Sequence, residues 1–239
     1  MADELPLFVL PMILLPGEVQ QLRIFEPRYK QMLDDCLLDK KNFGLVMNDD
    51  FVKTNGWDGP RNYGCEAEII HHETRGSNHF IEIIGRRRFV VEEVIEPALP
   101  PFSDASMADI IPDDGIFPDL ESIMSKIPDD SDNHKLYISA KVRFLDNDME
   151  LSENKLEELE EIFRRILSKI GQLLKMDKES FDDWVENQVS LIMYNNPHSI
   201  YSIAAMTVGD PEIKYQMLEF DDGQKLYDLL LEQLYVIEI

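Results

Sequence analysis

The order of hydrophobic and polar residues divides the chain into a first half that predicts strands and a second half that predicts helices. Segments that are apolar throughout, or that alternate apolar with polar residues, are typical of strands. Up to seven such segments lie in the first half, at residues 5–10, 19–25, 42–47, 64–72, 79–84, 89–95 and 106–111. Short strands joined by turns favour a small antiparallel barrel or sandwich.

Other parts of the first half follow different patterns. Residues 28–38 repeat apolar side chains at intervals of three and four after Pro27, which predicts one amphipathic helix of about three turns. Residues 48–62 are rich in Asp, Asn and Gly and predict a loop, and residues 75–78 predict a turn. Gly85 interrupts the pattern between two strands and is expected to mark a bulge or a bend.

The period of the pattern changes in the second half. Residues 136–145 still alternate and predict a strand, but a long helix is expected over residues 156–174, after the N-cap residue Ser152. Shorter helices are expected at residues 179–193, 199–207, 211–219 and 223–235. The sequence therefore predicts a β-domain over residues 1–114 and an α-helical bundle over residues 115–239.

The charge of the chain limits its partners. It carries 47 acidic and 23 basic residues out of 239, a formal net charge of −24. This charge repels phosphate groups, so binding to nucleic acid or to an anionic membrane is not expected. Cys36 and Cys65 are too few for a disulfide framework, and reduced thiols are typical of a cytoplasmic protein. No apolar run reaches the roughly 18 residues of a spanning helix, so we expect an acidic cytoplasmic protein.

The sequence holds few candidates for chemistry. His71, His72 and His79 lie on a predicted hairpin, but adjacent strand residues point to opposite faces, so at most two of them share a side. Neither Gly-x-Ser-x-Gly nor His-Glu-x-x-His is present, and no histidine adjoins either cysteine in sequence. We therefore expect no catalytic residue, no cofactor and no metal.

Arg86, Arg87 and Arg88 form the only triple basic run of this acidic chain. On a strand, Arg87 is expected to point away from the other two arginines. The run has two interpretations. It binds acidic peptide segments or a phosphate, or it pairs with carboxylates of the chain itself, such as Glu26 or Glu82. Pairing within the chain is the more common outcome where carboxylates are this abundant.

Several short sequences resemble the N-terminal, substrate-binding domain of Lon protease. In the first half they include Leu5-Pro6-Leu7-Phe8-Val9-Leu10-Pro11, Phe25-Glu26-Pro27-Arg28-Tyr29 and Gly85-Arg86-Arg87-Arg88-Phe89. In the second half, residues 214–219 and 226–230 resemble the closing helices of that family less closely, and Lys225 stands where the family has an Arg. No Gly-x-x-x-x-Gly-Lys-Ser/Thr sequence is present, so the ATPase activity of Lon is not implied.

The resemblance implies an α+β protein, a stand-alone substrate-binding domain. Its expected fold is a PUA-like antiparallel β-barrel with an inserted helix, followed by an α-helical bundle. The residues of the family sequences are expected to serve the structure; they are Phe25, Glu26, Pro27, Arg28, Tyr29, Gly85, Arg86, Arg88 and Phe89. Glu26, Arg28 and Tyr29 have two interpretations. They form a recognition surface, or the charged pair holds a strand–helix junction while Tyr29 enters the core.

The resemblance also implies a function. The protein is expected to bind exposed hydrophobic or unfolded polypeptide segments, or to act as an adaptor to a protease or chaperone, without ATPase or peptidase activity. Candidate peptide-binding residues are Met12, Met47, Trp57 and Arg87, and the alternative is that the methionines fill the barrel and Trp57 caps it. The surplus apolar face of helix 156–174 is expected to belong to the core of the bundle, and the alternatives are that it covers the barrel or joins two subunits of a homo-oligomer. A PUA-like RNA-binding module and a small-molecule sensor using the barrel pocket remain alternatives.

Overall fold

The computed structural model of the chain describes residues 3–112, 117–146, 151–173, 178–194, 196 and 198–238. Contacts between residues divide it into unit 1, Met1–Leu14 and Val19–Leu145, and unit 2, Leu15–Glu18 and Asp146–Ile239. The expected boundary at residue 114 falls outside the described residues, and the contacts place the division after Leu145. It lies later because the segment before Leu145 still contains a strand of the sheet in unit 1.

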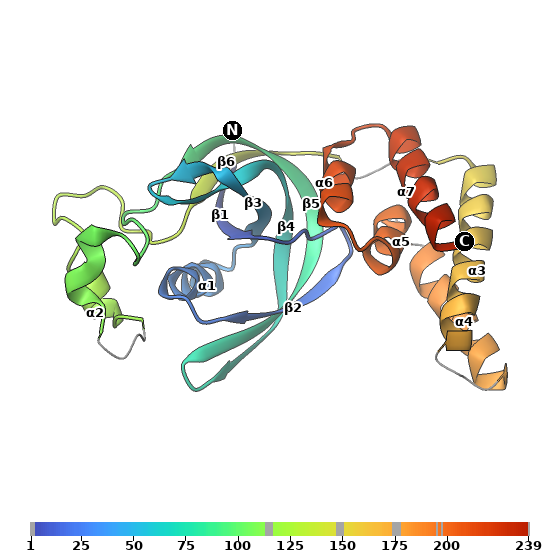
Figure 1. Cartoon of the computed structure of the whole chain (residues 1–239), viewed down its shortest axis with the longest axis horizontal. Coiled ribbons are helices and arrows are strands. Elements are labelled where there is room, and N and C mark those ends of the chain that lie inside the picture. The colour runs from blue at the N-terminus through green and yellow to red at the C-terminus, as the bar shows by residue number, and fades with distance from the viewer. Residues whose placement is uncertain are drawn as a thin grey trace. The chain divides into compact units, whose positions relative to one another are not determined.

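Unit 1 is built on a six-stranded sheet. Its strands are β1 (Asp3–Leu10), β2 (Val19–Ile24), β3 (Phe43–Thr54), β4 (Trp57–Arg75), β5 (Asn78–Ile95) and β6 (Ser139–Phe144). Their order is β2-β5-β4-β3-β1-β6, and β6 also pairs with β5 (Figure 1). Consequently β1, β3, β4, β5 and β6 form a closed ring of hydrogen-bonded neighbours, while β2 pairs, within the described sheet, with β5 alone.

The ring is not antiparallel throughout, which corrects the expected antiparallel barrel. β1 and β3 run parallel, with Leu7 opposite Gly44 and Leu10 opposite Met47, whereas the other pairs are antiparallel. Parallel neighbours need a crossover connection, and here it contains β2 and the helix α1 (Pro27–Asp39). The α+β class expected from the sequence is confirmed.

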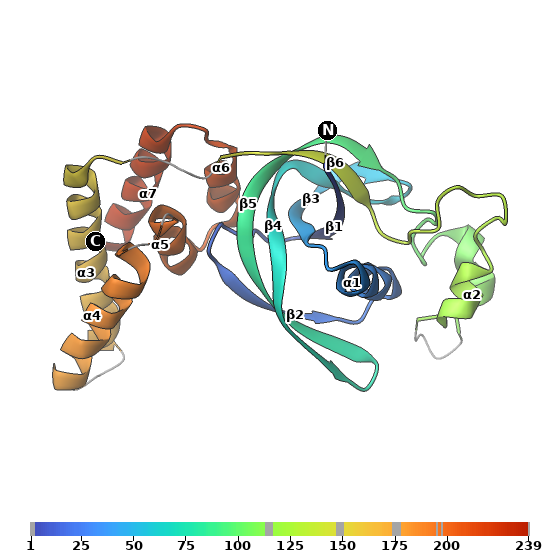
Figure 2. The same ribbon diagram turned by 180° about the vertical axis from the view of Figure 1, so that it is seen from behind.

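The helix α1 forms where residues 28–38 predicted it. Pro27 occupies its first turn, where the missing N–H of proline has no hydrogen bond to lose, and Lys40 ends it in the left-handed region with φ of 53°. Figures 1 and 2 show α1 between β1 and β2. Its buried face packs into a core cluster with strand residues, and members of this cluster include Phe8, Tyr29, Met32, Leu33, Cys36 and Phe43.

The predicted loop over residues 48–62 is wrong, because this segment is a long β-hairpin. β3 continues to Thr54, and the chain turns at Asn55 and Gly56, which have φ of 44° and 82°, before β4 begins. An Asn-Gly pair with positive φ at both residues is typical of a two-residue hairpin turn. The register shifts twice along the arm, so its side chains lose the regular alternation that identifies a strand in sequence.

β5 is one strand, although the sequence predicted two with Gly85 between them. The irregularity lies beside Gly85: Cys65 of β4 pairs with Arg88 and Ala67 pairs with Gly85, so Arg86 and Arg87 together oppose Glu66. The predicted strand at 106–111 is wrong, because that segment is the 3-10 helix η1 (Ala105–Ile110). Residues 136–145, in contrast, do contain a strand, β6.

Unit 2 is helical, as predicted. In the described residues it contains α3 (Glu153–Leu173), α4 (Lys178–Met193), α5 (Ser199–Thr207), α6 (Pro211–Glu219) and α7 (Gly223–Glu238). The last residue of the predicted helix 156–174 lies outside the described part. Both α3 and α5 contact α4 and α7, which buries the apolar face of α3. Among the described helices, none combines the length and the hydrophobicity needed to cross a membrane.

Candidate functional site

Four aromatic side chains of unit 1 form a continuous row. The ring centroids of Trp57 and Phe102 lie 6.2 Å apart, those of Phe102 and Phe117 5.8 Å, and those of Phe117 and Phe25 6.2 Å. Trp57 begins β4, Phe25 lies between β2 and α1, and Phe102 and Phe117 come from the connection between β5 and α2 (Leu120–Met124). The tertiary fold therefore assembles this aromatic row, Trp57, Phe102, Phe117 and Phe25, from three separate parts of the chain.

The Trp57 end of the row is held by polar contacts. The indole Nε1 of Trp57 donates a hydrogen bond to the carbonyl oxygen of Leu99 at 3.0 Å. The Arg28 guanidinium lies 3.7 Å from the centroid of the Trp57 ring and 4.2 Å from that of Tyr29, and its Nε is 2.9 Å from Glu26. Cation–π contacts of this kind stabilise both groups. Trp57 is thus a partly buried structural residue as well as a member of the row.

Tyr29 completes this junction. It is buried, and its hydroxyl donates a hydrogen bond to the carbonyl oxygen of Val9 at 2.8 Å. Burial raises the pKa of the Tyr29 hydroxyl far above its ordinary value, so it stays a neutral donor. The contacts of Glu26, Arg28 and Tyr29 thus agree with the structural interpretation of the Phe-Glu-Pro-Arg-Tyr sequence.

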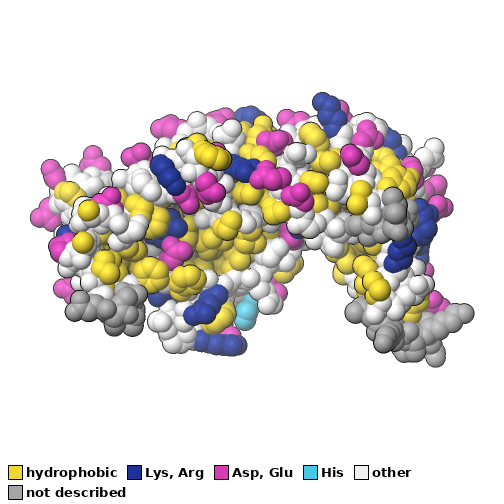
Figure 3. Space-filling model, viewed as in Figure 1, with side chains coloured by type: hydrophobic (Ala, Val, Ile, Leu, Met, Phe, Trp, Pro, Cys, Tyr) yellow, Lys and Arg dark blue, Asp and Glu magenta, His cyan; other side chains and the backbone are white. Residues whose placement is uncertain are grey.

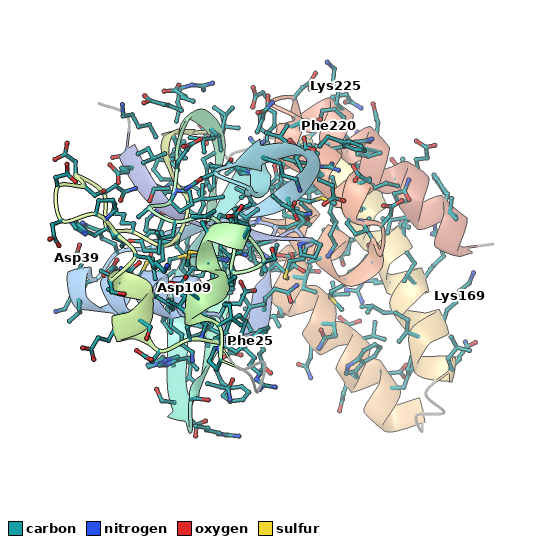
Figure 4. The ribbon with its side chains drawn as sticks, turned by 60° about the vertical axis from the view of Figure 1, so that its left-hand side comes forward. Phe25, Asp39, Asp109, Lys169, Phe220 and Lys225 are labelled. Carbon is teal, nitrogen blue, oxygen red and sulfur yellow. The ribbon has the colours of Figure 1, made fainter. Side chains whose placement is uncertain are left out.

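The Phe25 end of the row opens to solvent. Phe25 is 47% exposed, Phe117 41% and Leu120 57%, which is unusual for large apolar side chains so close together. They line a pocket of about 570 Å³, here called the Phe25 pocket. Figure 3 shows hydrophobic side chains gathered over the region of α2, and Figure 4 shows Phe25 beside this region and above the β4–β5 hairpin.

Polar residues border the Phe25 pocket with balanced charge. Arg23 and Lys30 supply positive charge, and Asp34 and Asp119 supply negative charge. The pocket is therefore close to neutral in a chain whose net charge is −24. Asp119 accepts hydrogen bonds from the backbone N–H and hydroxyl of a serine in α2, so it also caps that helix.

A histidine also borders the pocket. The Nδ1 of His79 lies 3.2 Å from the Nε2 of His72, and Thr74 Oγ1 lies 3.1 Å from the same Nδ1. Burial lowers the pKa of His79; the nearby Asp34 opposes this shift and His72 adds to it. The histidine therefore favours its neutral form, which adds no charge to the pocket near neutral pH.

The predicted peptide-binding residues do not lie together. Trp57 belongs to the aromatic row, but Met12 is half-buried against the core cluster of α1, and Met47 is half-buried opposite Leu10. Neither methionine lines the Phe25 pocket. Met12 thus packs against the core as the alternative interpretation expects, whereas the half-buried Met47 belongs to none of the described core clusters.

The arginine run is paired within the chain. Arg87 donates two hydrogen bonds to Glu66, at 2.7 and 3.1 Å, and Arg86 donates to Glu68 at 2.5 Å. Arg88 is fully buried. The expected alternation holds between the exposed Arg87 and the buried Arg88 but is wrong for Arg86, which is exposed like Arg87, because the bulge places both opposite Glu66. Glu68 and Glu66 are the carboxylates in these contacts, where the sequence suggested Glu26 or Glu82 as examples.

The sequence did not indicate Phe102, Phe117 or Leu120 as site residues. A signal was present, because Phe102 follows Pro100-Pro101 and Phe117 precedes Pro118. Prolines disfavour the interior of a helix or sheet, so these positions indicate irregular segments whose large aromatic side chains pack against other parts of the fold. Phe25 was expected to be structural, and the structure leaves nearly half of its surface exposed.

The described residues offer little for catalysis or for metal binding. Burial, aided by Asp35 and Asp39, raises the pKa of the Cys36 thiol to about 12, which makes it a poor nucleophile. Cys65 is also buried. Within the described part of the chain, no three His, Cys, Asp or Glu side chains are grouped so as to hold a metal ion.

Comparison with known proteins gives the family of this fold. A model of the family described as the ATP-dependent protease La (LON) substrate-binding domain matches residues 4–235. The chain therefore belongs to this family. A comparison with curated protein sequences gave no match.

Two solved structures have a similar fold. A Lon N-terminal domain protein from Xanthomonas campestris is 20% identical in sequence with a TM-score of 0.56, over 96% of this chain and 98% of that chain. The N-terminal domain of the Mycobacterium avium complex Lon protease is 12% identical with a TM-score of 0.60, over 98% of both chains. At these identities the similarity concerns the fold.

Proposed function

We propose that this protein binds exposed hydrophobic segments of polypeptides and that the Phe25 pocket receives their side chains. The observation that carries the proposal is the shared exposure of Phe25, Phe117 and Leu120 around one pocket. Burying an apolar side chain there removes apolar surface of both partners from water. This stabilises the complex by roughly 25 cal/mol for each Å² of apolar surface removed. The proposed role is binding alone, without ATP hydrolysis or peptide cleavage, and fits delivery of the bound chain to a protease or chaperone.

The electrostatic balance of the pocket supports the same function. Most of the surface of this acidic chain repels acidic polypeptides, whereas the pocket has two basic and two acidic neighbours, Arg23, Lys30, Asp34 and Asp119. A nearly neutral apolar site accepts many sequences, because it does not require a particular charge on the ligand. The two buried cysteines fit the reducing cytoplasm, and we propose that location on this ground.

The arginine contacts weaken the RNA-binding alternative. Arg86 and Arg87 were the feature that kept this alternative open, and both already bind carboxylates of the chain. An RNA phosphate would have to displace Glu66 and Glu68 in a chain that repels phosphates. We therefore favour a polypeptide over a nucleic acid as the ligand.

The test compares two phenylalanines, one that is expected to contact the bound polypeptide and one that is not. Phe25→Glu places a charge in the Phe25 pocket, while Phe51→Glu places one at a side chain that is 98% exposed on the β3–β4 arm. We expect Phe25→Glu to weaken binding of an unfolded, fluorescently labelled model polypeptide by at least about tenfold, since a buried charge opposes apolar contact. Phe51→Glu is expected to change the dissociation constant by less than about twofold, because a fully exposed side chain makes few contacts.

Fluorescence anisotropy at low and high salt measures both variants, and circular dichroism checks that each is folded. Trp57 is a less suitable target, because its replacement also removes the contact with Arg28. Equal affinities for Phe25→Glu and the unmodified protein would contradict the proposed site. No binding of unfolded polypeptide by the unmodified protein would contradict the function itself.

A further inference from the structure

β2 is the one strand of the described sheet with a single neighbour. The ring closes on itself through the pairing of β5 with β6, so the free edge of the sheet in unit 1 belongs to β2. Proteins commonly protect such an edge with lysine, proline or a bulge. The sequence of β2, Val-Gln-Gln-Leu-Arg-Ile, contains neither lysine nor proline, its one charged side chain, Arg23, donates hydrogen bonds to Asn78 of β5, and its pairing with β5 runs without a register shift.

The outer edge of β2 offers backbone hydrogen-bonding groups. In an antiparallel pair, alternate residues direct their N–H and C=O groups to the partner, and the residues between direct theirs outward. Among the described residues, no backbone hydrogen bond outside the β2–β5 pairing involves residues 21–24. This stretch of β2 therefore presents unused donors and acceptors at the spacing of a strand.

Pockets lie along the same stretch. Gln21, Leu22 and Arg23 line a second pocket of about 350 Å³, together with Phe80 and other residues of β4 and β5. Arg23 also lines the Phe25 pocket, so the two pockets meet at the end of β2. A strand beside β2 would advance about 3.3 Å per residue, and its side chains would alternate between the two faces of the sheet. Both pockets therefore adjoin the edge along which such a strand would lie.

We propose that an extended polypeptide segment adds to the free edge of β2 as a further strand and inserts an apolar side chain into the Phe25 pocket. This inference rests on the proposed function and names its binding mode. Backbone pairing with residues 21–24 supplies affinity that is independent of sequence, and the Phe25 pocket supplies the preference for apolar side chains. The ligand class is a segment rich in Val, Ile, Phe and Thr, without proline, as unfolded strand proteins expose.

Selective methylation of peptide amides tests this mode. The probe is a fluorescein-labelled twelve-residue peptide of alternating phenylalanine and threonine with serine ends, and two derivatives carry N-methyl groups on every second amide, in opposite registers. Strand addition uses the amides of one register only, so one derivative is expected to bind at least about tenfold more weakly than the other. Equal dissociation constants for the two derivatives would overturn the inference.

Amide hydrogen exchange locates the contact on the protein. We expect alternate amides among residues 21–24 to exchange quickly in the free protein and slowly when the unmethylated peptide is bound. Peptide binding that requires Phe25 but leaves these amides unprotected would overturn strand addition and retain the proposed function. Protection that appears without peptide and rises with protein concentration would assign the edge to a second copy of the chain, and would equally overturn the inference. No peptide binding at all contradicts the proposed function first.

Discussion

At the residue scale, the most informative contact is the ion pair of Arg87 with Glu66. Glu66 is 6% exposed, and it accepts hydrogen bonds from Arg87 and, at 3.0 Å, from Asn42. The Arg87 guanidinium also lies 3.5 Å from the centroid of the Phe144 ring. Burial alone would raise the pKa of Glu66, but the hydrogen bonds from Arg87 and Asn42 outweigh burial and hold this pKa below its ordinary value. Arg87 therefore joins β4, β5 and β6.

Removing Arg87 is expected to destabilise the protein more than removing its neighbour. Arg87→Ala leaves the buried Glu66 with one fewer partner, at a cost of about 1–3 kcal/mol in the free energy of unfolding. Arg86→Ala is the matched control, because Arg86 pairs with Glu68, which is exposed; we expect a cost below about 1 kcal/mol. Urea denaturation followed by circular dichroism measures both. Equal losses in the free energy of unfolding for the two variants would mean that burial of Glu66 does not strengthen its pair with Arg87.

The effect of Arg87→Ala is expected to depend on pH. A carboxyl whose pKa is lowered by folding stabilises the protein at pH values above its ordinary pKa, which is 4.5 for Glu66. This stabilisation is lost as the pH falls through the lowered pKa of the folded state. The difference in stability between Arg87→Ala and the unmodified protein should therefore be full at pH 7 and shrink at more acidic pH. Urea titrations at a series of pH values measure it, and a constant difference would contradict the assignment.

At the element scale, the close packing of strands across the ring depends on glycines. An added Cβ at Gly64 of β4 would lie 2.4 Å from Val46 Cγ1, 2.5 Å from Phe89 Cζ and 2.8 Å from the carbonyl oxygen of Leu45. One at Gly44 of β3 would lie 2.6 Å from the same Phe89 ring atom. The Phe89 ring thus packs over two glycines of neighbouring strands, which explains why Phe89 is fully buried.

Gly64→Ala is expected to destabilise the sheet by about 1–3 kcal/mol, because the added methyl group meets backbone as well as side-chain atoms. Gly209→Ala is the control, since nothing lies within 4 Å of its added Cβ. Thermal unfolding followed by circular dichroism compares the two variants. A Gly64→Ala protein as stable as the control would contradict the prediction, because it would show that the strands around Gly64 accommodate the added methyl group at no cost.

At the scale of the whole molecule, a short segment of the first half belongs to the helical unit. Residues Leu15–Glu18 group with the helices of unit 2. The buried Glu18 accepts a hydrogen bond from the Leu15 N–H at 2.8 Å. It also forms an ion pair with Lys214 of α6, with 3.2 Å between Nζ and Oε1. Unit 2 is therefore built from two separate parts of the chain, and the Glu18–Lys214 pair joins residues that are 196 positions apart in sequence.

Replacing Lys214 tests this arrangement. Lys214→Met removes the positive partner of a buried carboxylate, and we expect it to lower the free energy of unfolding by about 1–3 kcal/mol. Lys225→Met is the matched control, because Lys225 is exposed on α7 (Figure 4). Adding Glu18→Gln to Lys214→Met should restore part of the loss, since it removes the unpaired charge. Denaturation in urea measures the four proteins, and equal effects of the two lysine changes would contradict a stabilising pair.

The helix α1, the helices of unit 2 and most strands followed from local pattern, because each depends on residues close together in sequence; α2 was not predicted, and η1 was expected to be a strand. The spacing of apolar residues at three and four located α1 and the helices of unit 2. The β3–β4 arm was missed because its register shifts and polar side chains remove the alternation that marks a strand. The parallel pairing of β1 with β3 was missed as well, since nothing local specifies which strands become neighbours.

The change from strands to helices along the chain, the family resemblance and the negative net charge could all be read from the sequence, since these depend on composition and on short segments. Only the tertiary structure decided the partners of the arginines, the aromatic row and the free edge of β2. The aromatic row joins Phe25 to Phe117 and Trp57 to Phe102 across long stretches of chain. The physical reason is that burial and pairing depend on distances between remote residues, which local propensity does not encode.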